Sequence, residues 1–177
     1  GSFDCILMVE SLKHCSDLDK ALASVAQALT DNGVCYVVED VYQKDPSYQQ
    51  DHSDATDQKR GQQLCHDWHL KKLWSFTDLH KTATSKGLDL SIHSDLTALM
   101  TLPGILLIRV KLAVFSMLAK LTKSSVWPIY RGGFILDLFY AQKQMRYQVL
   151  TLTKASSEKK NRQETHLKAT NAQGNSL

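Results

Sequence analysis

The chain has 177 residues, of which 43% are hydrophobic and 22% charged, as is typical of a soluble globular protein with one core. Its net charge of +3 is too small to indicate a nucleic-acid-binding protein. The four cysteines show no paired spacing, and the first residues lack a basic start. These features argue against a disulfide framework and a signal peptide, and they predict a reducing, cytoplasmic setting.

The first predicted element is a short buried strand that ends at polar residues. Residues 5–9 are all apolar, Glu10 and Ser11 follow directly, and His14 comes four residues after the glutamate. A short apolar run bounded by polar residues is typical of a strand buried on both faces. Ligands of open α/β sheets bind beyond the carboxyl ends of the strands, so Glu10, Ser11 and His14 are candidate site residues.

A helix and a second strand are predicted next. Ser16 or Asp17 can cap a helix, and Gly33 suits the left-handed position that follows a helix end. The apolar face of this helix consists of Leu18, Leu22, Val25 and Leu29. Residues 34–38 are again apolar and end at Glu39 and Asp40. This order predicts a βαβ unit with two parallel strands.

The middle of the chain is more polar. Residues 43–66 predict a long loop or a weak helix over the carboxyl edge of the sheet. The run 65–69 (Cys-His-Asp-Trp-His) contains metal-binding residue types, but no second ligand pair stands at a zinc-like spacing, so no metal site is predicted. A helix capped by Thr77 and ended by Gly87 should follow, and the alternating residues 88–93 predict a strand.

Residues 98–122 form the most apolar segment, and three interpretations stay open. The segment can be an amphipathic helix lying on the domain, a helix on a membrane surface, or a membrane span. Arg109 and Lys111 lie near its middle and disfavour the span, because each costs roughly 2.5–3.5 kcal/mol on insertion scales. The polar stripe Arg109, Ser116, Lys120 and Lys123 at helical spacing favours the first interpretation.

The last part of the chain predicts a turn, a helix, a strand and a tail. Pro128 and the Gly132-Gly133 pair indicate a turn over residues 127–133. Residues 134–140 predict a short helix, and residues 147–153 predict the final strand. Residues 155–177 contain no aromatic side chain and are rich in Ser, Lys, Asn and Gln, so they predict a disordered tail.

Several short blocks, taken in order, resemble a known family. They are Gly1-Ser2-Phe3-Asp4, Glu10-Ser11-Leu12-Lys13-His14, Asp31-Asn32-Gly33, Phe76-Thr77-Asp78-Leu79, Ser94-Asp95-Leu96-Thr97 and Met145-Arg146-Tyr147-Gln148-Val149-Leu150. Together they resemble the C-terminal half of a class I S-adenosylmethionine-dependent methyltransferase. The similar group is the small-molecule, methyltransferase type 11 group that includes sterol and tocopherol methyltransferases. The resemblance covers residues 1–154, which would form a partial methyltransferase domain.

The resemblance implies an α/β fold that is the C-terminal half of a Rossmann-like sheet. Strands four (4–10), five (34–39), six (88–93) and seven (147–153) would lie in the order 4-5-7-6. The last strand would be antiparallel, and a helical cap over about residues 98–146 would precede it. Strands one to three and the glycine-rich turn near the cofactor would be missing, and the sequence contains no Gly-x-Gly.

Without those strands, strand four would expose an apolar edge that invites pairing with another chain. Three explanations stay open: a truncated enzyme, a split enzyme completed by a partner chain, and a degenerate domain with another role. The chain alone is expected to be inactive and to need a completing N-terminal half or partner chain.

The implied activity is methyl transfer from S-adenosylmethionine to a small organic acceptor. A lipophilic acceptor is one interpretation of the apolar insertion at 98–146, and the other is that this insertion only completes the core. Glu10 and His14 would be the catalytic residues, and Glu10 and Ser11 would contact the cofactor. The predicted substrate-binding residues are Asp40, Tyr42, Trp68, Asp95 and Arg131, and Tyr147 is a further candidate to line the pocket. Structural alternatives stay open, since Glu10 can cap the next helix and His14 can simply be solvated.

Two other functions are weighed against this one. A non-catalytic methyltransferase-like scaffold or subunit would also fit a chain without the nucleotide-binding half. A Rossmann dehydrogenase is disfavoured by the antiparallel final strand that the resemblance implies. The apolar cap fits a lipophilic acceptor. It also leaves open a peripheral contact with a membrane, but not a membrane span.

Overall fold

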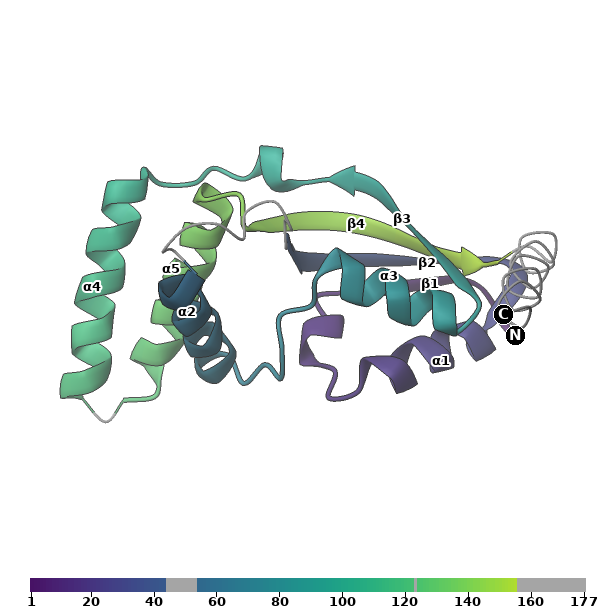
Figure 1. Cartoon of the computed structure of the whole chain (residues 1–177), viewed down its shortest axis with the longest axis horizontal. Helices are drawn as coiled ribbons and strands as arrows, with labels where there is room; N and C mark the ends of the chain where they lie inside the picture. Colours follow the sequence, from purple (N-terminus) through teal and green to yellow (C-terminus); the bar gives the residue numbers. More distant parts are fainter. Residues whose placement is uncertain (44–53, 123, 156–177) are drawn as a thin grey trace, which may run out of the picture.

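A computed structural model describes residues 1–43, 54–122 and 124–155. The strands are β1 (Phe3–Val9), β2 (Leu29–Tyr42), β3 (Leu88–Asp95) and β4 (Met145–Lys154). The helices are α1 (Leu18–Ala28), α2 (Asp54–Asp67), α3 (Phe76–Ser85), α4 (Ile105–Leu121) and α5 (Val126–Ala141), with short 3-10 turns η1 (Leu12–His14) and η3 (Thr97–Leu99). Figure 1 shows α1 and α3 along one face of the sheet, whereas α2, α4 and α5 gather beyond one end of the strands.

The four strands form one sheet in the order β1-β2-β4-β3. β1 and β2 are parallel, and β4 runs antiparallel to both of its neighbours. This arrangement confirms the predicted order 4-5-7-6 with an antiparallel last strand. β1, β2 and β3 therefore end at the same edge of the sheet, where β4 begins.

The start of β2 corrects the predicted end of the first helix. Helix α1 is capped by Asp17, which accepts a hydrogen bond from the backbone N–H of Lys20, and it ends at Ala28. Gly33 lies inside β2 and has no left-handed backbone. A Cβ on Gly33 would lie 2.9 Å from the carbonyl oxygen of Phe3, so the close approach of β1 accounts for the glycine.

Helix α3 begins earlier than predicted. Its cap is Ser75 and not Thr77, and Ser75 forms a reciprocal capping box with Asp78. The helix is followed by Gly87, whose φ of 71° agrees with the predicted left-handed helix end. Residues 44–53, within the predicted loop or weak helix, lie outside the described residues, and α2 occupies the following stretch.

The main hydrophobic core lies between the sheet and the two helices on its face. Leu22 of α1, Leu79 of α3, Val37 of β2 and Leu150 of β4 are each at most 2% exposed. Burying a side chain of this size contributes about 1.5–3 kcal/mol. The packing of α1 and α3 therefore fixes the strands whose ends form the site described below.

Strand β1 is packed on one face only, which corrects the prediction of a strand buried on both faces. Ile6 and Met8 pack against the core, but Phe3, Leu7 and Val9 are 56%, 66% and 54% exposed. Among the described residues no strand pairs with the outer edge of β1. The edge consequently presents both apolar side chains and unpaired backbone groups.

Helix α5 corrects the predicted turn at residues 127–133. Pro128 stands in its first turn, where a missing N–H costs no intrahelical hydrogen bond. A second core forms around α5 and α2 and includes Leu64, Ile135 and Phe139. Residues 156–177, most of the predicted tail, lie outside the described residues.

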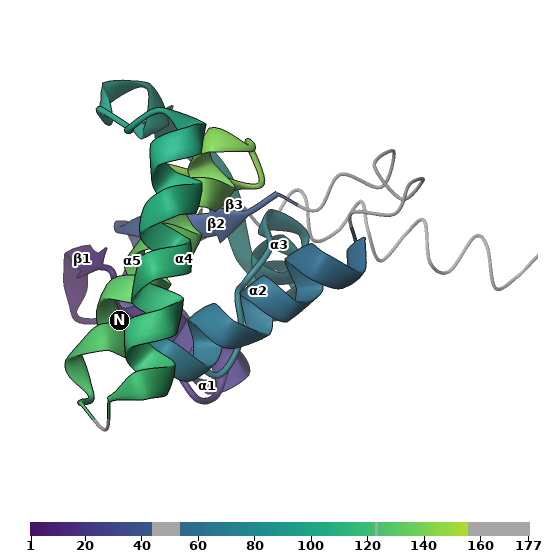
Figure 2. The ribbon, with the colours of Figure 1, turned by 90° about the vertical axis from the view of Figure 1, so that its left-hand side faces the viewer.

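Helix α4 packs on α5 and lies at the end of the molecule away from β1's first residues (Figures 1 and 2). Ile108 is its one buried residue. Of the helices that the structure describes, none combines the length and the hydrophobicity that crossing a membrane requires.

Candidate active site at the carboxyl edge of the sheet

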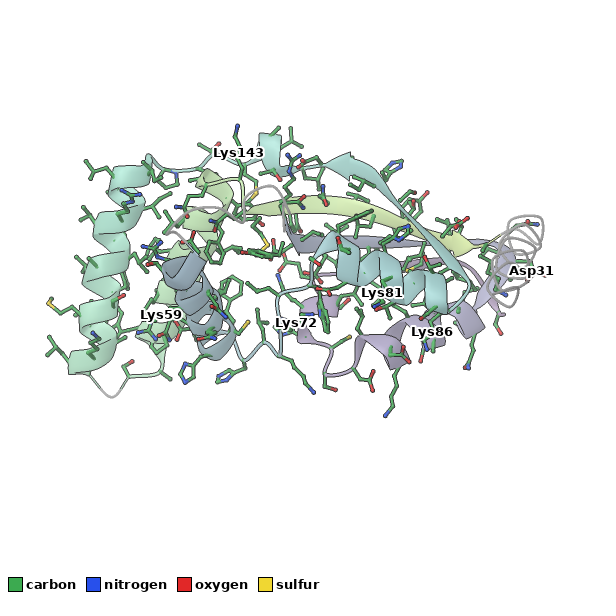
Figure 3. The ribbon with its side chains drawn as sticks, in the orientation of Figure 1. Asp31, Lys59, Lys72, Lys81, Lys86 and Lys143 are labelled. Carbon is green, nitrogen blue, oxygen red and sulfur yellow. The ribbon has the colours of Figure 1, made fainter. Side chains whose placement is uncertain are left out.

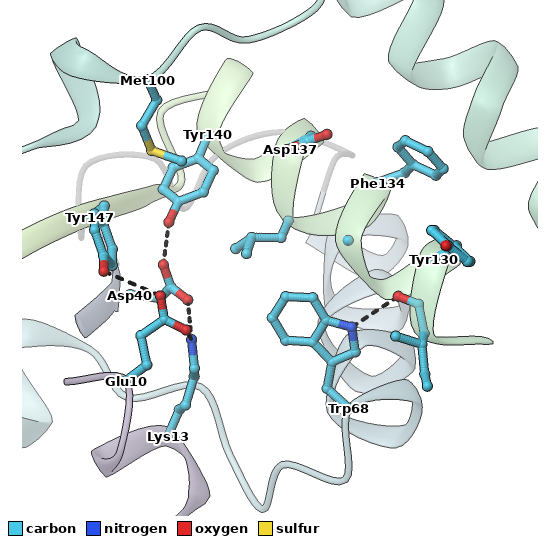
Figure 4. Close-up of a pocket in the computed structure, with 13 residues that line it drawn as sticks. Glu10, Lys13, Asp40, Trp68, Met100, Tyr130, Phe134, Asp137, Tyr140 and Tyr147 are labelled. Atoms are coloured by element: carbon cyan, nitrogen blue, oxygen red, sulfur yellow. Dashed lines mark hydrogen bonds and ion pairs between the residues drawn. The ribbon is translucent and has the colours of Figure 1, made fainter. Parts of the chain in front are cut away.

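A pocket of about 400 Å³ lies where β1 and β2 end (Figure 4). The position is the one at which open α/β sheets bind ligands. Turns after the strands, α5 and the start of β4 supply most of its wall. The lining residues are Glu10, Lys13, Asp40, Trp68, Met100, Ile129, Tyr130, Gly133, Phe134, Leu136, Asp137, Tyr140 and Tyr147.

Lys13 is the central cation of this pocket, and three carboxylates surround it. Its Nζ lies 2.7 Å from Asp40 Oδ2, 3.2 Å from Glu10 Oε2 and 3.7 Å from Glu39 Oε1. The side chain is only 8% exposed. Burial by itself lowers the pKa of Lys13, but the hydrogen bond to Asp40 and the nearby carboxylates outweigh it and raise the pKa above the ordinary value. The ammonium therefore stays charged.

Two tyrosines donate hydrogen bonds to the carboxylates from the opposite wall. Tyr140 on α5 donates to Asp40 Oδ1, and Tyr147 on β4 donates to Glu10 Oε1 over 3.2 Å (Figure 4). Burial and the neighbouring carboxylates raise the pKa of Tyr140 and of Tyr147. Both phenols stay protonated at neutral pH and act as donors.

Glu39 supports the site from the interior of the protein. It is 1% exposed, and one of its oxygens accepts the backbone N–H of Lys13 over 3.1 Å. Burial raises the pKa of Glu39, and the Lys13 contacts offset this rise only in part. Glu39 thus fixes the backbone of η1 and, through it, the position of the Lys13 side chain.

Glu10 is the most accessible carboxylate of the cluster. Its side chain is 52% exposed, compared with 9% for Asp40. Its φ of 49° places it in the left-handed region, which is uncommon for a residue other than glycine. Its backbone N–H still donates to the carbonyl of Val38 over 2.8 Å, which extends the pairing of β1 with β2 by one residue. Such strained residues gather at functional sites.

Trp68 forms a wall of the pocket and is held from two sides. Its indole Nε1 donates to the carbonyl of Ile129 over 3.0 Å. A Cβ on Gly132 would lie 2.5 Å from the same nitrogen, so the indole lies directly against the glycine. Lys13 Nζ lies 5.7 Å from the Trp68 ring centroid, within cation–π range.

The structure brings three of the predicted site residues to the pocket, namely Glu10, Asp40 and Trp68. Tyr147, the further candidate, also lines it. His14 does not line it and is exposed on η1. Ser11 does not line it either, but its Oγ is buried and has no hydrogen-bond partner among the described residues.

The three remaining candidates do not line the pocket. Tyr42 packs in the second core, with its ring centroid 6.2 Å from that of Phe139. Asp95 accepts hydrogen bonds from Arg146 and from the backbone of Thr97. Arg131, described next, faces α2.

Arg131 joins α5 to α2 through Asp67. Its Nε donates to Asp67 Oδ2 over 2.8 Å, and a terminal nitrogen donates to Oδ1 over 2.6 Å. Burial alone raises the pKa of Asp67, but the bonds from Arg131, His66 and Gln63 hold it below the ordinary value. Asp67 belongs to the run 65–69, which contains metal-binding residue types. In the described part of the chain no three His, Cys, Asp or Glu side chains are grouped as metal ligands.

Lys13 and Tyr140 are two charged or polar pocket residues that sequence reasoning missed. A lysine is normally solvated, so nothing in the local pattern marks Lys13 as buried. Its spacing of three from Glu10 after a strand end was the available signal. Tyr140 meets Asp40 across 100 positions of the chain, and an apolar helix pattern does not identify that contact.

Comparison with known proteins shows which family model and which solved structures this chain resembles. Residues 1–37 match the family model described as a methyltransferase domain. No curated protein sequence matches the chain. A mycolic acid cyclopropane synthase solved with S-adenosylhomocysteine has a TM-score of 0.59 at 12% identity, over 86% of this chain and 56% of that one.

Two further solved structures show the same relationship. The geranyl diphosphate C-methyltransferase of Streptomyces coelicolor A3(2) has a TM-score of 0.53 at 14% identity, over 86% of this chain and 47% of that one. The phosphoethanolamine N-methyltransferase 2 of Haemonchus contortus has a TM-score of 0.52 at 14% identity, over 87% of this chain and 34% of that one.

These matches confirm the resemblance to methyltransferases and the Rossmann-like fold. The chain spans about half the length of the solved structures it matches.

Proposed function

We propose that this chain is the acceptor-side half of an S-adenosylmethionine-dependent methyltransferase acting on a small organic acceptor. The observation that carries the proposal is the carboxylate-rich pocket at the ends of β1 and β2 in a methyltransferase fold. The match of residues 1–37 to the methyltransferase model includes β1 and the turn that holds Glu10 and Lys13.

The pocket fits the positively charged part of S-adenosylmethionine. Three carboxylates face a single ammonium, which leaves an excess of negative charge. The aromatic faces around the pocket favour a cation further. Glu10 and the buried, unpartnered hydroxyl of Ser11 follow β1, the strand with the open edge, and would lie on the cofactor side. When bound, the cofactor supplies a methyl group activated by a sulfonium.

Among the carboxylates of the cluster, Glu10 is the one placed to act on the reacting group of the acceptor. Tyr147 and Lys13 orient its carboxylate, which still faces the pocket. It would stabilise positive charge on the acceptor, or accept a proton where the acceptor must lose one. The geometry favours Glu10 over His14 for this task. Asp40 already accepts hydrogen bonds from Lys13 and Tyr140, so its role would be to position these two side chains.

The remaining wall favours an acceptor with apolar bulk. Trp68, Tyr130, Phe134 and Leu136 line it beside the charged cluster. An apolar wall supplies non-directional affinity, and a few polar groups then set the orientation. Asp40 and Trp68 are thus the predicted substrate residues that the proposal retains.

The open edge of β1 supports the proposal that further strands complete the sheet. These strands, upstream in the same protein or on a partner chain, would pair with β1 and cover Phe3, Leu7 and Val9. They would also hold the nucleoside part of the cofactor, so the chain alone would be inactive. Its four free cysteines are compatible with a reducing cytoplasm.

Calorimetric titration with S-adenosylmethionine tests this function. The 177-residue chain and the same chain with its native upstream residues are compared. We expect only the extended form to bind. If the extended form does not bind, the enzyme proposal is wrong. Binding by the short chain would contradict the assignment of the nucleoside contacts to the missing strands.

A non-catalytic methyltransferase-like scaffold or subunit is the second candidate. It is favoured by the absence of Gly-x-Gly from the sequence. In that case the β1 edge would bind a partner strand, and neither form would bind the cofactor.

A further inference from the structure

The outward side of α4 carries an apolar strip that no described residue covers. The strip, which we call the outer face of α4, consists of Leu106, Val110, Val114, Met117 and Leu121. Spacings of four, four, three and four place these residues on one side of the helix. They are between 44% and 74% exposed. Figure 2 turns this end of the molecule toward the reader, and Figure 3 shows side chains of α4 projecting away from the body.

The charge around the strip has one sign. The charged residues of α4 are Arg109, Lys111 and Lys120, and none of them is acidic. On α4, Arg109 and Lys120 are eleven positions apart, which is three helical turns, and both are exposed along one border of the outer face. Lys111 lies on the other side of the helix, with its Nζ 5.4 Å from the Phe134 ring centroid. The strip is therefore bordered by fixed positive charge.

We propose that the outer face of α4 docks on the surface of an anionic lipid bilayer. Apolar side chains would enter the boundary between headgroups and acyl chains, and Arg109 and Lys120 would reach the anionic headgroups. The proposal does not depend on methyl transfer.

Two other occupants fit the charge and geometry less well. A second copy of this chain would bring the same cations together, which costs free energy. Strands that complete the sheet would add beside β1, at right angles to the strand direction, whereas α4 lies beyond the strand ends (Figures 1 and 2).

Packing on the inner side of α4 links this helix to the part of α5 that lines the pocket. Phe115 of α4 packs against Tyr130 of α5, with ring centroids 5.6 Å apart. Tyr130, Ile129 and Met100 line the pocket and are 53%, 56% and 37% exposed. The same part of α5 thus contacts α4 and forms a wall of the pocket.

Vesicle co-sedimentation of the full chain tests the docking. Vesicles of phosphatidylcholine alone are compared with vesicles of phosphatidylcholine and phosphatidylserine. We expect binding to the mixed vesicles and much weaker binding to the neutral ones. The double variant Leu106→Glu, Met117→Glu should lose binding. Arg109→Gln with Lys120→Gln should weaken binding to the mixed vesicles about fivefold for each cation removed.

Leu7→Glu on β1 is the matched control, because Leu7 is 66% exposed on the other apolar surface. It should bind as the unmodified chain does. Circular dichroism of each variant verifies that the exposed substitutions leave the fold intact. Failure of the unmodified chain to bind, or loss of binding in Leu7→Glu alone, would overturn the proposal. So would a dimer that Leu106→Glu dissociates, seen by sedimentation velocity, if no vesicle binding accompanies it.

Discussion

Two buried charge clusters in this molecule differ in their balance of charge. Between α2 and α5, Arg131 and Asp67 form a bidentate pair with one charge of each sign, and they are 12% and 0% exposed. At the end of the sheet, Lys13 faces three carboxylates, of which Glu10 is 52% exposed. In the first cluster, the charges and hydrogen-bonding groups of Arg131 and Asp67 are paired with each other. The second keeps an excess of negative charge that opens onto a pocket.

We interpret this difference as the one between a structural ion pair and the proposed binding site. A balanced pair offers nothing to a ligand, because its hydrogen-bonding groups already have partners. An unbalanced cluster has a positive charge missing, and a cationic ligand can supply it. Arg131, predicted to bind substrate, belongs by its contacts to the first kind, and Lys13, which was not predicted, belongs to the second.

Replacing the cation of the unbalanced cluster should have the largest effect on stability. Lys13→Met leaves Glu39 and Asp40 buried without a cation, which should cost about 5 kcal/mol of unfolding free energy at neutral pH. The loss should shrink as acid protonates the carboxylates. Urea unfolding measures it. Lys20→Met is the matched control, since Lys20 is 86% exposed and should cost less than about 1 kcal/mol. Equal losses in both variants would contradict the buried network.

Arg131→Met should cost somewhat less, about 3 kcal/mol, because Gln63 and His66 still contact Asp67. Adding Asp67→Leu should recover most of that loss, since no unpaired charge then remains. The equivalent pair Lys13→Met, Asp40→Leu should recover little, because Glu39 stays buried. Urea unfolding of six variants, the two single variants and the double variant of each pair, gives both double-mutant cycles. Equal recovery in the two cycles would contradict the difference in charge balance between the two clusters.

The pH dependence of stability should have opposite signs at the two sites. The lowered pKa of Asp67 makes its stabilisation present above the unfolded value near 3.9 and lost as the pH falls through the folded value. The pKa of Glu39 is raised, so its contribution is fully present below the unfolded value near 4.3 and is lost as the pH rises through the folded value.

Glu39→Gln should remove the decrease in stability with rising pH and leave the acid loss due to Asp67. Urea unfolding at a series of pH values tests this. The interpretation fails if the variant and the unmodified chain have parallel pH profiles.

Glu10→Gln should have the smallest effect on stability, below about 1 kcal/mol, because the carboxylate is half exposed. In a completed enzyme the same change should lower kcat about 10²–10³-fold, since it removes charge stabilisation at the reacting group. Methyl transfer and urea unfolding are measured on the same preparation. Full activity in Glu10→Gln would exclude the proposed role.

The strands could be predicted from the sequence because β1 and β2 contain apolar runs and β3 alternates apolar and polar residues. Their order followed from the family resemblance. Helix α5 could not, since Pro128 and Gly132 carry the usual signals of a turn. Pro128 is tolerated in the first helical turn, and the helical Gly132 is explained by Trp68, which is distant in sequence.

The site residues could likewise be predicted only where local sequence patterns identify them. Glu10 and Asp40 follow apolar strands, and the general rule for open α/β sheets brings such residues to one edge. The burial of Lys13 and the contact from Tyr140 depend on packing between distant elements, which local patterns do not encode. His14 has a suitable residue type and spacing, but η1 directs the chain so that His14 is exposed.

The contact between Gly132 and Trp68 has a consequence for how acceptor size could evolve. A glycine within a helix costs about 1 kcal/mol relative to alanine, yet here a single methyl group would collide with the indole. The indole would have to move, although Gly132 itself does not line the pocket. One mutation outside the pocket could therefore change its width while every charged group keeps its place. Under the proposed function, a substitution at Gly132 would change the acceptor bulk that the pocket admits without replacing Glu10.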